Sequence, residues 1–114
     1  MKIVRRVLES VVILEITGDI RLGESAQTFS QELKSLLEEP NVLGVILNME
    51  NINYMDSTGL GELVGYLSRF KDEGKRLRLV KPNPVVMKLL ALTRLDQFFK
   101  VCPDEATALE DFVS

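Results

Sequence analysis

The chain has 114 residues, enough for one domain with its own core, and its 46% hydrophobic and 27% charged residues are ordinary for a globular protein. Fourteen basic against seventeen acidic residues give a net charge of −3, so the basic excess typical of nucleic-acid-binding proteins is missing. The chain has no histidine and one cysteine, Cys102, which excludes internal disulfides, His-dependent catalytic dyads and triads, and His-containing metal sites.

No stretch approaches the roughly 18 apolar residues of a membrane span, and the N-terminus Met1-Lys2-Ile3 does not open a signal peptide. We therefore expect a cytoplasmic protein that neither inserts into a membrane nor binds nucleic acid. Cys102 lies between Val101 and Pro103 without a basic neighbour, which predicts a buried, inert thiol. We expect no metal and no cofactor.

The first elements predicted along the chain are two strands, Ile3–Leu8 and Val11–Thr17, joined as a hairpin. A short loop follows. Apolar residues then recur at helical spacing from Ala26 to Leu37, with Ser25 as a candidate N-cap and Pro40 as a stop.

The middle of the chain alternates between strand and helix patterns. Val42–Met49 is an apolar run of the kind that forms a strand buried on both faces. One face of a helix is marked from Leu60 to Phe70, with Gly74 as a candidate C-terminal cap. Leu77–Val80 is the next predicted strand.

The last third of the chain repeats this alternation. Asn83-Pro84 is typical of an N-cap followed by the first helical residue, Phe98–Val101 predicts a short strand, and Pro103-Asp104 opens a final helix. The predicted order is ββαβαβαβα, which indicates an α/β fold: one domain over residues 1–114, with a mixed, mostly parallel sheet covered by about four helices.

The stretch YMDSTGLG, Tyr54 to Gly61, places an acid, two hydroxyls and two glycines in six positions where a strand gives way to a helix. Ligands in open α/β sheets gather at the carboxyl ends of strands, and helix N-termini favour negative charge. This stretch is therefore the candidate functional site.

Nucleotide binding is the weakest interpretation of it. A dinucleotide fingerprint would need glycine where Val64 stands, and no Gly-Lys-Ser/Thr motif is present. Two interpretations stay equally open from the residues alone. Either Ser57 or Thr58 caps the helix while Asp56 complements its dipole, or a hydroxyl is modified by another protein's active site.

Asp-Ser-Thr-Gly-Leu-Gly at 56–61 resembles the phosphorylation motif of bacterial anti-sigma factor antagonists, whose fold is the STAS domain (sulphate transporter and anti-sigma antagonist). Gly18 and the segments 84–90 and 93–98 extend the likeness over nearly the whole chain. The resemblance implies that Ser57 accepts a phosphoryl group from an anti-sigma factor, an ATP-dependent serine kinase. The unmodified antagonist would bind that kinase and free the sigma factor, and a phosphatase would reset the phosphorylated form.

The resemblance also implies which residues surround Ser57. Asp56, Thr58, Gly59 and Gly61 would shape the site, with Thr58 open as a minor acceptor.

The partner surface is expected on the exposed side of the helix 59–71 and on the loop before the first helix; its residues would be Glu62, Asp19, Arg21, Glu24 and Ser25. Arg21 stands where the family commonly has an acid. Either Asp19 or Glu24 replaces that acid, or the partner differs, or phosphorylation is weak.

Two other classes of function stay open. A scaffold or accessory subunit of a signalling or transport assembly has the same fold and would self-associate stably. An antagonist would bind a kinase only when dephosphorylated, and weak self-association is compatible with it. A transporter's own cytoplasmic domain is not expected because no membrane segment precedes the fold. An enzyme is disfavoured by the lack of histidine and of a metal cluster, so we expect a binding module without activity of its own.

Overall fold

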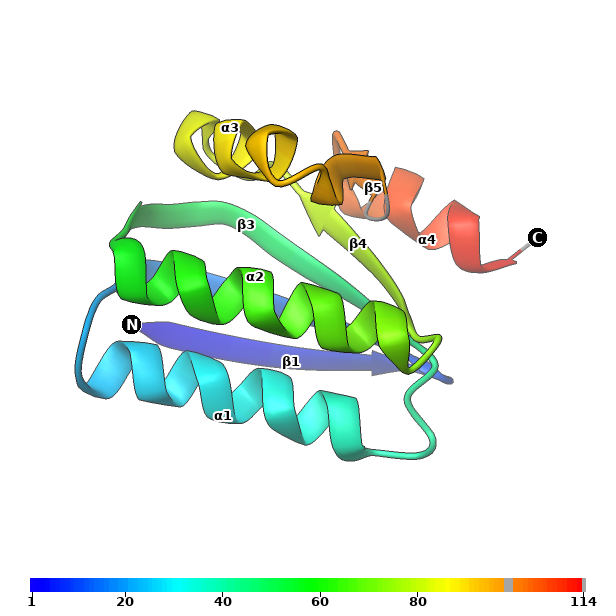
Figure 1. Ribbon diagram of the computed structural model, residues 1–114. Coiled ribbons are helices and arrows are strands. Elements are labelled where there is room, and N and C mark those ends of the chain that lie inside the picture. The colour runs from blue at the N-terminus through cyan, green and yellow to red at the C-terminus, as the bar shows by residue number, and fades with distance from the viewer. Residues whose placement is uncertain (98–99, 114) are drawn as a thin grey trace.

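A five-stranded sheet forms the centre of the computed structural model, which describes residues 1–97 and 100–113 (Figure 1). The strands lie in sequence order, with β1 antiparallel to β2 and every later neighbour parallel. Their bounds are β1 Lys2–Leu8, β2 Val11–Ile20, β3 Gly44–Met55, β4 Arg76–Val80 and β5 Lys100–Cys102. The helices are α1 Glu24–Glu38, α2 Ser57–Asp72, α3 Pro84–Leu92 and α4 Glu105–Val113, with a 3₁₀ turn η1 at Leu95–Gln97. The predicted fold class and element order are confirmed.

Helices cover both faces of the sheet. α1 and α2 lie side by side on one face with α3 beside them, while α4 packs on the other face (Figure 1). Alternate side chains of each strand enter the two cores, as strand geometry requires. The larger core includes Leu14, Ile16, Phe29, Leu33, Leu47, Leu63, Phe70 and Leu79; the smaller one includes Ile13, Ile46, Val80, Cys102 and Ala108.

Two strands run further than the sequence pattern predicted. β2 continues through Gly18, with φ of 111°, to Ile20, and β3 continues to Met55, so that Ile20 pairs with Met55. β4 accompanies β3 only as far as Asn48. Beyond that point polar residues are exposed along β3, so the apolar pattern ends although the hydrogen bonding to β2 does not. The extension brings the end of β3 directly to the start of α2.

The predicted helix ends are partly right. Asn83 accepts a hydrogen bond from the backbone N–H of Val86 at 3.0 Å and caps α3, as expected. Gly74 follows α2 with φ of 71°, which confirms the predicted C-terminal signal. The prediction that Ser25 is the N-cap of α1 is wrong. Gly23 occupies that position and makes no side-chain hydrogen bond.

The C-terminal strand is seen from Lys100 to Cys102, whereas residues 98 and 99 of its predicted range lie outside the described residues. Cys102 is 1% exposed, as predicted, and burial raises the pKa of its thiol. The carboxylate of Asp104 accepts the backbone N–H of Thr107 at 2.7 Å, at the start of α4.

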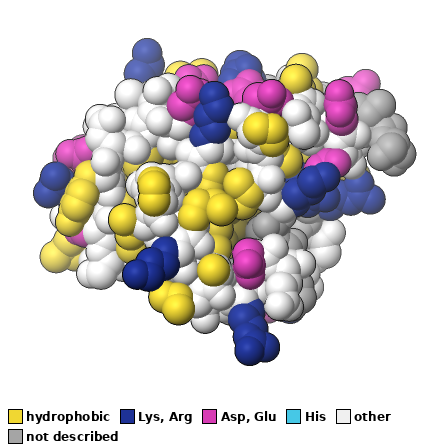
Figure 2. Space-filling model, turned by 90° about the horizontal axis from the view of Figure 1, so that it is seen from above, with side chains coloured by type: hydrophobic (Ala, Val, Ile, Leu, Met, Phe, Trp, Pro, Cys, Tyr) yellow, Lys and Arg dark blue, Asp and Glu magenta, His cyan; other side chains and the backbone are white. Residues whose placement is uncertain are grey.

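The outer face of α3 is apolar. Val85, Met87 and Leu92 are exposed there, and the view from above shows apolar side chains gathered in the middle of this face with charged ones around them (Figure 2). Such an exposed patch is typical of a contact surface. Of the helices in residues 1–97 and 100–113, none has the length and apolar character needed to cross a membrane.

Candidate functional site

Asp56 joins three segments at the start of α2. Its Oδ1 accepts the backbone N–H of Gly59 at 2.9 Å, and its Oδ2 accepts the backbone N–H of Leu22 at 2.8 Å. Its own N–H donates to the carbonyl of Ile20 at 3.1 Å. The bonds from Gly59 and Leu22 lower the pKa of Asp56, because they stabilise the charged carboxylate. Asp56 is therefore the N-cap of α2, and of the two interpretations left open, the one in which Ser57 or Thr58 caps the helix is wrong.

Ser57 is the first residue of α2, and its side chain is exposed. Within the part of the chain that the structure describes, no hydrogen bond engages its hydroxyl. The cap is supplied by the preceding residue, so the hydroxyl of Ser57 is not needed for capping and is exposed at the first turn of α2. Thr58, the neighbouring hydroxyl, is half-buried.

The two glycines of the motif have different environments. A Cβ on Gly59 would lie 2.8 Å from Ile20 Cγ2, 2.8 Å from Met55 Cγ and 3.2 Å from the carbonyl oxygen of Ile20. The close packing of α2 on the ends of β2 and β3 therefore requires glycine at this position. Gly61 is exposed, and a Cβ there would meet no atom within 4 Å.

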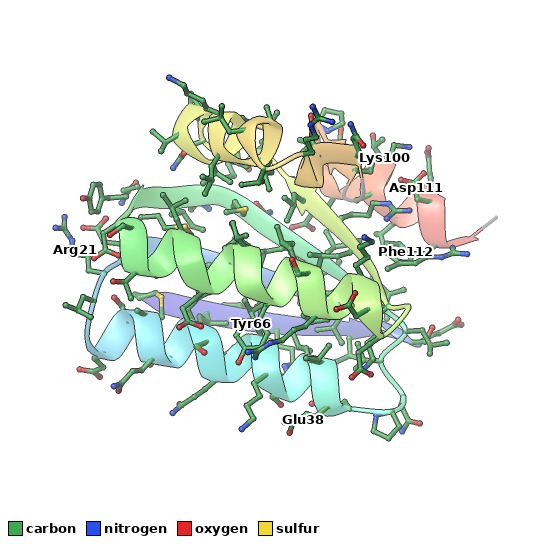
Figure 3. The ribbon with its side chains drawn as sticks, viewed as in Figure 1. Arg21, Glu38, Tyr66, Lys100, Asp111 and Phe112 are labelled. Atoms are coloured by element: carbon green, nitrogen blue, oxygen red, sulfur yellow. The ribbon has the colours of Figure 1, made fainter. Side chains whose placement is uncertain are left out.

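The loop between β2 and α1 is fixed beside the motif (Figure 3). The hydroxyl of Ser25 accepts the backbone N–H of Arg21 at 2.8 Å and donates to its carbonyl at 3.1 Å, which explains why Ser25 does not cap α1. The guanidinium of Arg21 lies 4.3 Å from the centre of the Tyr54 ring, and its Nη2 lies 3.3 Å from Asp19 Oδ2. The arginine that replaces the expected acid is thus paired with residues at the ends of β2 and β3.

The predicted partner residues divide between two hollows of the surface. Thr58 and Glu62 line a groove between α1 and α2 together with Leu22. A second hollow is lined by Asp19, Arg21, Glu24 and Ser25. Ser57 and Gly61 line neither and stand on the open surface of α2.

Sequence reasoning missed Leu22 and Tyr54. Leu22 is 78% exposed and supplies the N–H that binds Asp56, while Tyr54 supports Arg21. The available signal was an apolar residue in a polar loop next to Gly23. The outer face of α3 was also missed, although the apolar run of that helix is interrupted only by Lys88 and leaves little polar surface to face water.

Asp56 is the acidic group that lies next to the two hydroxyls of the motif. The carboxylate of Asp56 is bound by two backbone N–H groups and its pKa is lowered, so it is a poor base for the neighbouring hydroxyl. No three His, Cys, Asp or Glu side chains form a metal-binding group among the described residues.

The element order, together with an Asp-Ser-Thr-Gly helix start at the end of a parallel strand, defines a STAS-type α/β domain. The family model of the STAS domain matches residues 2–108, and the chain belongs to this family, as the resemblance predicted.

Two related proteins are both named as anti-sigma factor antagonists. The chain is 30% identical over 96 residues to the anti-sigma-B factor antagonist of Staphylococcus aureus, covering 81% of this chain and 87% of that protein. It is 22% identical over 101 residues to the anti-sigma F factor antagonist of Paenibacillus polymyxa, covering 89% and 86%. The fold resembles that of the Bacillus cell fate determinant SpoIIAA in its phosphorylated form, with a TM-score of 0.81 at 19% identity over 97% of this chain and 99% of that one.

Proposed function

We propose that the protein is an anti-sigma factor antagonist. Its unmodified form binds an anti-sigma factor kinase and releases the sigma factor, and phosphorylation of Ser57 ends that complex. The observation that carries the proposal is the exposed hydroxyl of Ser57 at the first position of α2, left free because Asp56 caps the helix. The naming of a 30% identical relative as an anti-sigma-B factor antagonist supports the same function.

The phosphoryl group has to come from a partner. Asp56 is held by the N–H groups of Leu22 and Gly59 and does not activate Ser57, so the kinase supplies both ATP and the base. Ser57 is accessible to another protein's active site because it is exposed in the first turn of α2. The residue four positions further on the same helix face is Gly61, which has no side chain to block the approach.

Phosphorylation changes the surface without disturbing the fold. A phosphoryl group adds about −1.5 to −2 charges, and the positive end of the α2 dipole favours such charge at the first turn by up to about 1 kcal/mol. A complex would bury the same group beside Asp56. Burying charge without a partner costs several kcal/mol, and roughly 4 kcal/mol weakens a complex about a thousandfold.

The partner surface in this proposal consists of the exposed side of α2 and the loop before α1. Glu62 and Thr58 contribute from the groove between α1 and α2. The second hollow contributes Asp19 at the end of β2, Arg21 in the loop, and Glu24 and Ser25 at the start of α1. A phosphatase that recognises phosphorylated Ser57 resets the switch.

The acceptor is tested by incubating the protein with ATP and the anti-sigma factor encoded in the same genome, followed by peptide mass spectrometry. We expect one phosphate, on Ser57, in the native sequence and in Thr58→Ala, and none in Ser57→Ala. A phosphate that stays in Ser57→Ala would show that another residue is the acceptor.

A scaffold or accessory subunit is the second candidate, favoured by the apolar outer face of α3 with Val85, Met87 and Leu92. Sedimentation at several concentrations separates the two. The antagonist stays monomeric or associates weakly, whereas a stable oligomer that persists on dilution would favour the scaffold.

A further inference from the structure

Arg21 is held near the start of α2 by contacts of both its side chain and its backbone. Its guanidinium lies over the ring of Tyr54, three residues before Ser57, at 4.3 Å. Its backbone is fixed by the hydroxyl of Ser25, and the next N–H of the loop, that of Leu22, binds Asp56 at 2.8 Å. Figure 3 shows Arg21 beside the first turn of α2.

The charge of Arg21 reaches the motif. The pKa of Asp56 is lowered mainly by the backbone N–H groups of Gly59 and Leu22, and the positive charge of Arg21 lowers it further. Asp56 directly precedes Ser57, so a phosphoryl group on the Ser57 hydroxyl would also be acted on by the positive charge of Arg21. Arg21 therefore interacts with two negative charges, those of Asp19 and Asp56.

The ion pair between Arg21 and Asp19 is weak enough to be replaced by a stronger one. The ion pair with Asp19 has one contact of 3.3 Å, and the two side chains are 58% and 42% exposed. Such pairs add little to stability. A phosphoryl group carries nearly twice the charge of a carboxylate and three acceptor oxygens, and it matches the two-pronged geometry of a guanidinium.

We propose that Arg21 is the intramolecular partner of phosphorylated Ser57: its guanidinium leaves Asp19 for the phosphoryl group while its stacking on Tyr54 keeps it near. This inference rests on Ser57 being the phosphoacceptor. The exchange leaves Asp19 unpaired, so one modification changes the charge at two points of the partner surface. It also stabilises the phosphorylated, dissociated state.

The test uses protein carrying phosphoserine at position 57 by genetic encoding, so that no kinase is needed. The second pKa of the phosphoserine, ordinarily about 6, is measured by ³¹P NMR titration. Arg21→Ala should raise it by about half a unit relative to the native sequence, because the nearby cation that favours the dianion is lost. Arg21→Lys, which keeps the charge, should give a smaller rise.

Arg69→Ala is the matched control. Arg69 also stacks on a tyrosine, Tyr66, at 4.9 Å, but it lies three turns further along α2. Its removal should leave the phosphoserine pKa unchanged. Equal pKa values for the native sequence and Arg21→Ala, or an equal rise in Arg69→Ala, would overturn the proposal.

The native sequence gives a second readout that involves no substitution. The ¹⁵N and ¹H resonances of the Arg21 side-chain Nε–H should shift when Ser57 carries phosphate, while those of Arg69 should not. Unchanged Arg21 resonances would also overturn the proposal. Neither outcome bears on which residue the kinase modifies, which the mass-spectrometric experiment decides separately.

Discussion

Gly59 and Gly61 lie two positions apart in one motif, yet only the first is required by packing. Gly59 is surrounded by Ile20 and Met55, which are themselves buried at the ends of their strands. Gly61 faces open space. The fold therefore explains one glycine, and the proposed function explains the other, since a bare helix surface lets a partner approach Ser57.

Substituting each glycine by alanine tests this difference. Gly59→Ala should destabilise the protein by about 1–3 kcal/mol, because the new methyl group must displace Ile20 or Met55. Gly61→Ala should be neutral or stabilise by up to about 1 kcal/mol, because alanine favours the helix. Both values come from urea unfolding followed by circular dichroism. A large loss of stability in Gly61→Ala would contradict the geometry described for this helix face.

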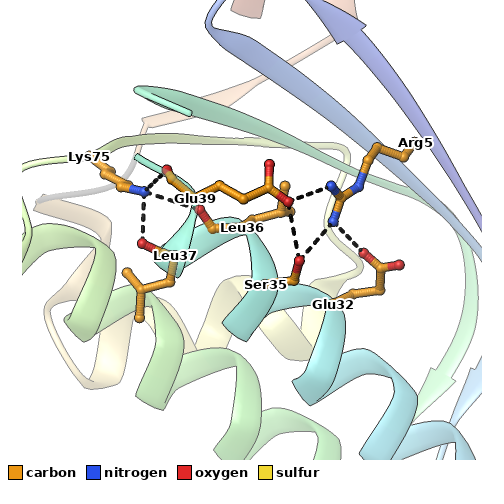
Figure 4. A network of polar contacts seen from close by, with 7 residues as sticks. All are labelled: Arg5, Glu32, Ser35, Leu36, Leu37, Glu39 and Lys75. Carbon is orange, nitrogen blue, oxygen red and sulfur yellow. Dashed lines mark hydrogen bonds and ion pairs between the residues drawn. The ribbon is translucent and has the colours of Figure 1, made fainter. Parts of the chain in front are cut away.

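At the scale of the elements, a lysine from another segment terminates α1. Lys75, just before β4, donates from Nζ to the carbonyls of Leu36 at 3.1 Å, Leu37 at 2.7 Å and Glu39 at 2.8 Å (Figure 4). These carbonyls have no partner within the helix. No local sequence signal predicts this role for Lys75, because the contact joins residues 36 to 39 positions apart in the chain.

Lys75→Met should destabilise the protein by about 2 kcal/mol, because hydrogen bonds to a charged group are lost at a part-buried helix end. The control is Lys34→Met on the same helix, which removes an exposed pair with Glu38 at 3.9 Å and should cost at most about 0.5 kcal/mol. Both are measured by thermal melting and urea titration. Similar losses for the two variants would mean that Lys75 acts only as a surface charge.

Local signals predicted the elements, but they did not choose correctly among neighbouring candidates for two of the N-caps. Asn83-Pro84 was assigned correctly because the bond from Val86 closes within three residues. Asp56 was not recognised as the cap, although its bond from Gly59 also closes within three residues, because the neighbouring Ser57 and Thr58 are also suitable N-cap residues. Because Asp56 is the cap, the capping interpretation of Ser57 loses its support. The hydroxyl of Ser57 is exposed and makes no hydrogen bond to a described residue, as the modification interpretation requires. Arg21 was identified from the sequence as a departure, but its stacking on Tyr54 depends on the register of β2 against β3.

At the scale of the whole molecule, native contacts lower the pKa values of several carboxyl groups. Backbone N–H groups act on Asp56 and Asp104, and cationic side chains act on Glu39, Glu105 and Asp111. A carboxyl whose pKa is lower in the folded state stabilises the fold above its unfolded pKa, about 3.9 for Asp and 4.3 for Glu. That stability is lost as the pH falls through the folded pKa.

We therefore expect a melting temperature that is nearly constant from about pH 5.5 to 7 and falls steeply below about pH 4. The plateau follows because the chain has no histidine to titrate in that range. Differential scanning calorimetry across pH 2.5 to 7, roughly the window set by these groups, measures the profile. A marked loss of stability between about pH 5.5 and 7 would contradict this description of the charges.

The most direct test of the account is a titration of the cognate anti-sigma factor with the protein in two forms, unmodified and carrying phosphoserine at position 57. The account predicts that the unmodified form binds and that phosphoserine weakens binding by about a hundredfold or more, while the melting temperatures of the two free forms stay close. Ser57→Ala should bind like the unmodified form and remain bound when ATP is added. Equal affinity of the unmodified and phosphorylated forms would contradict the proposal that Ser57 is the switch of this protein.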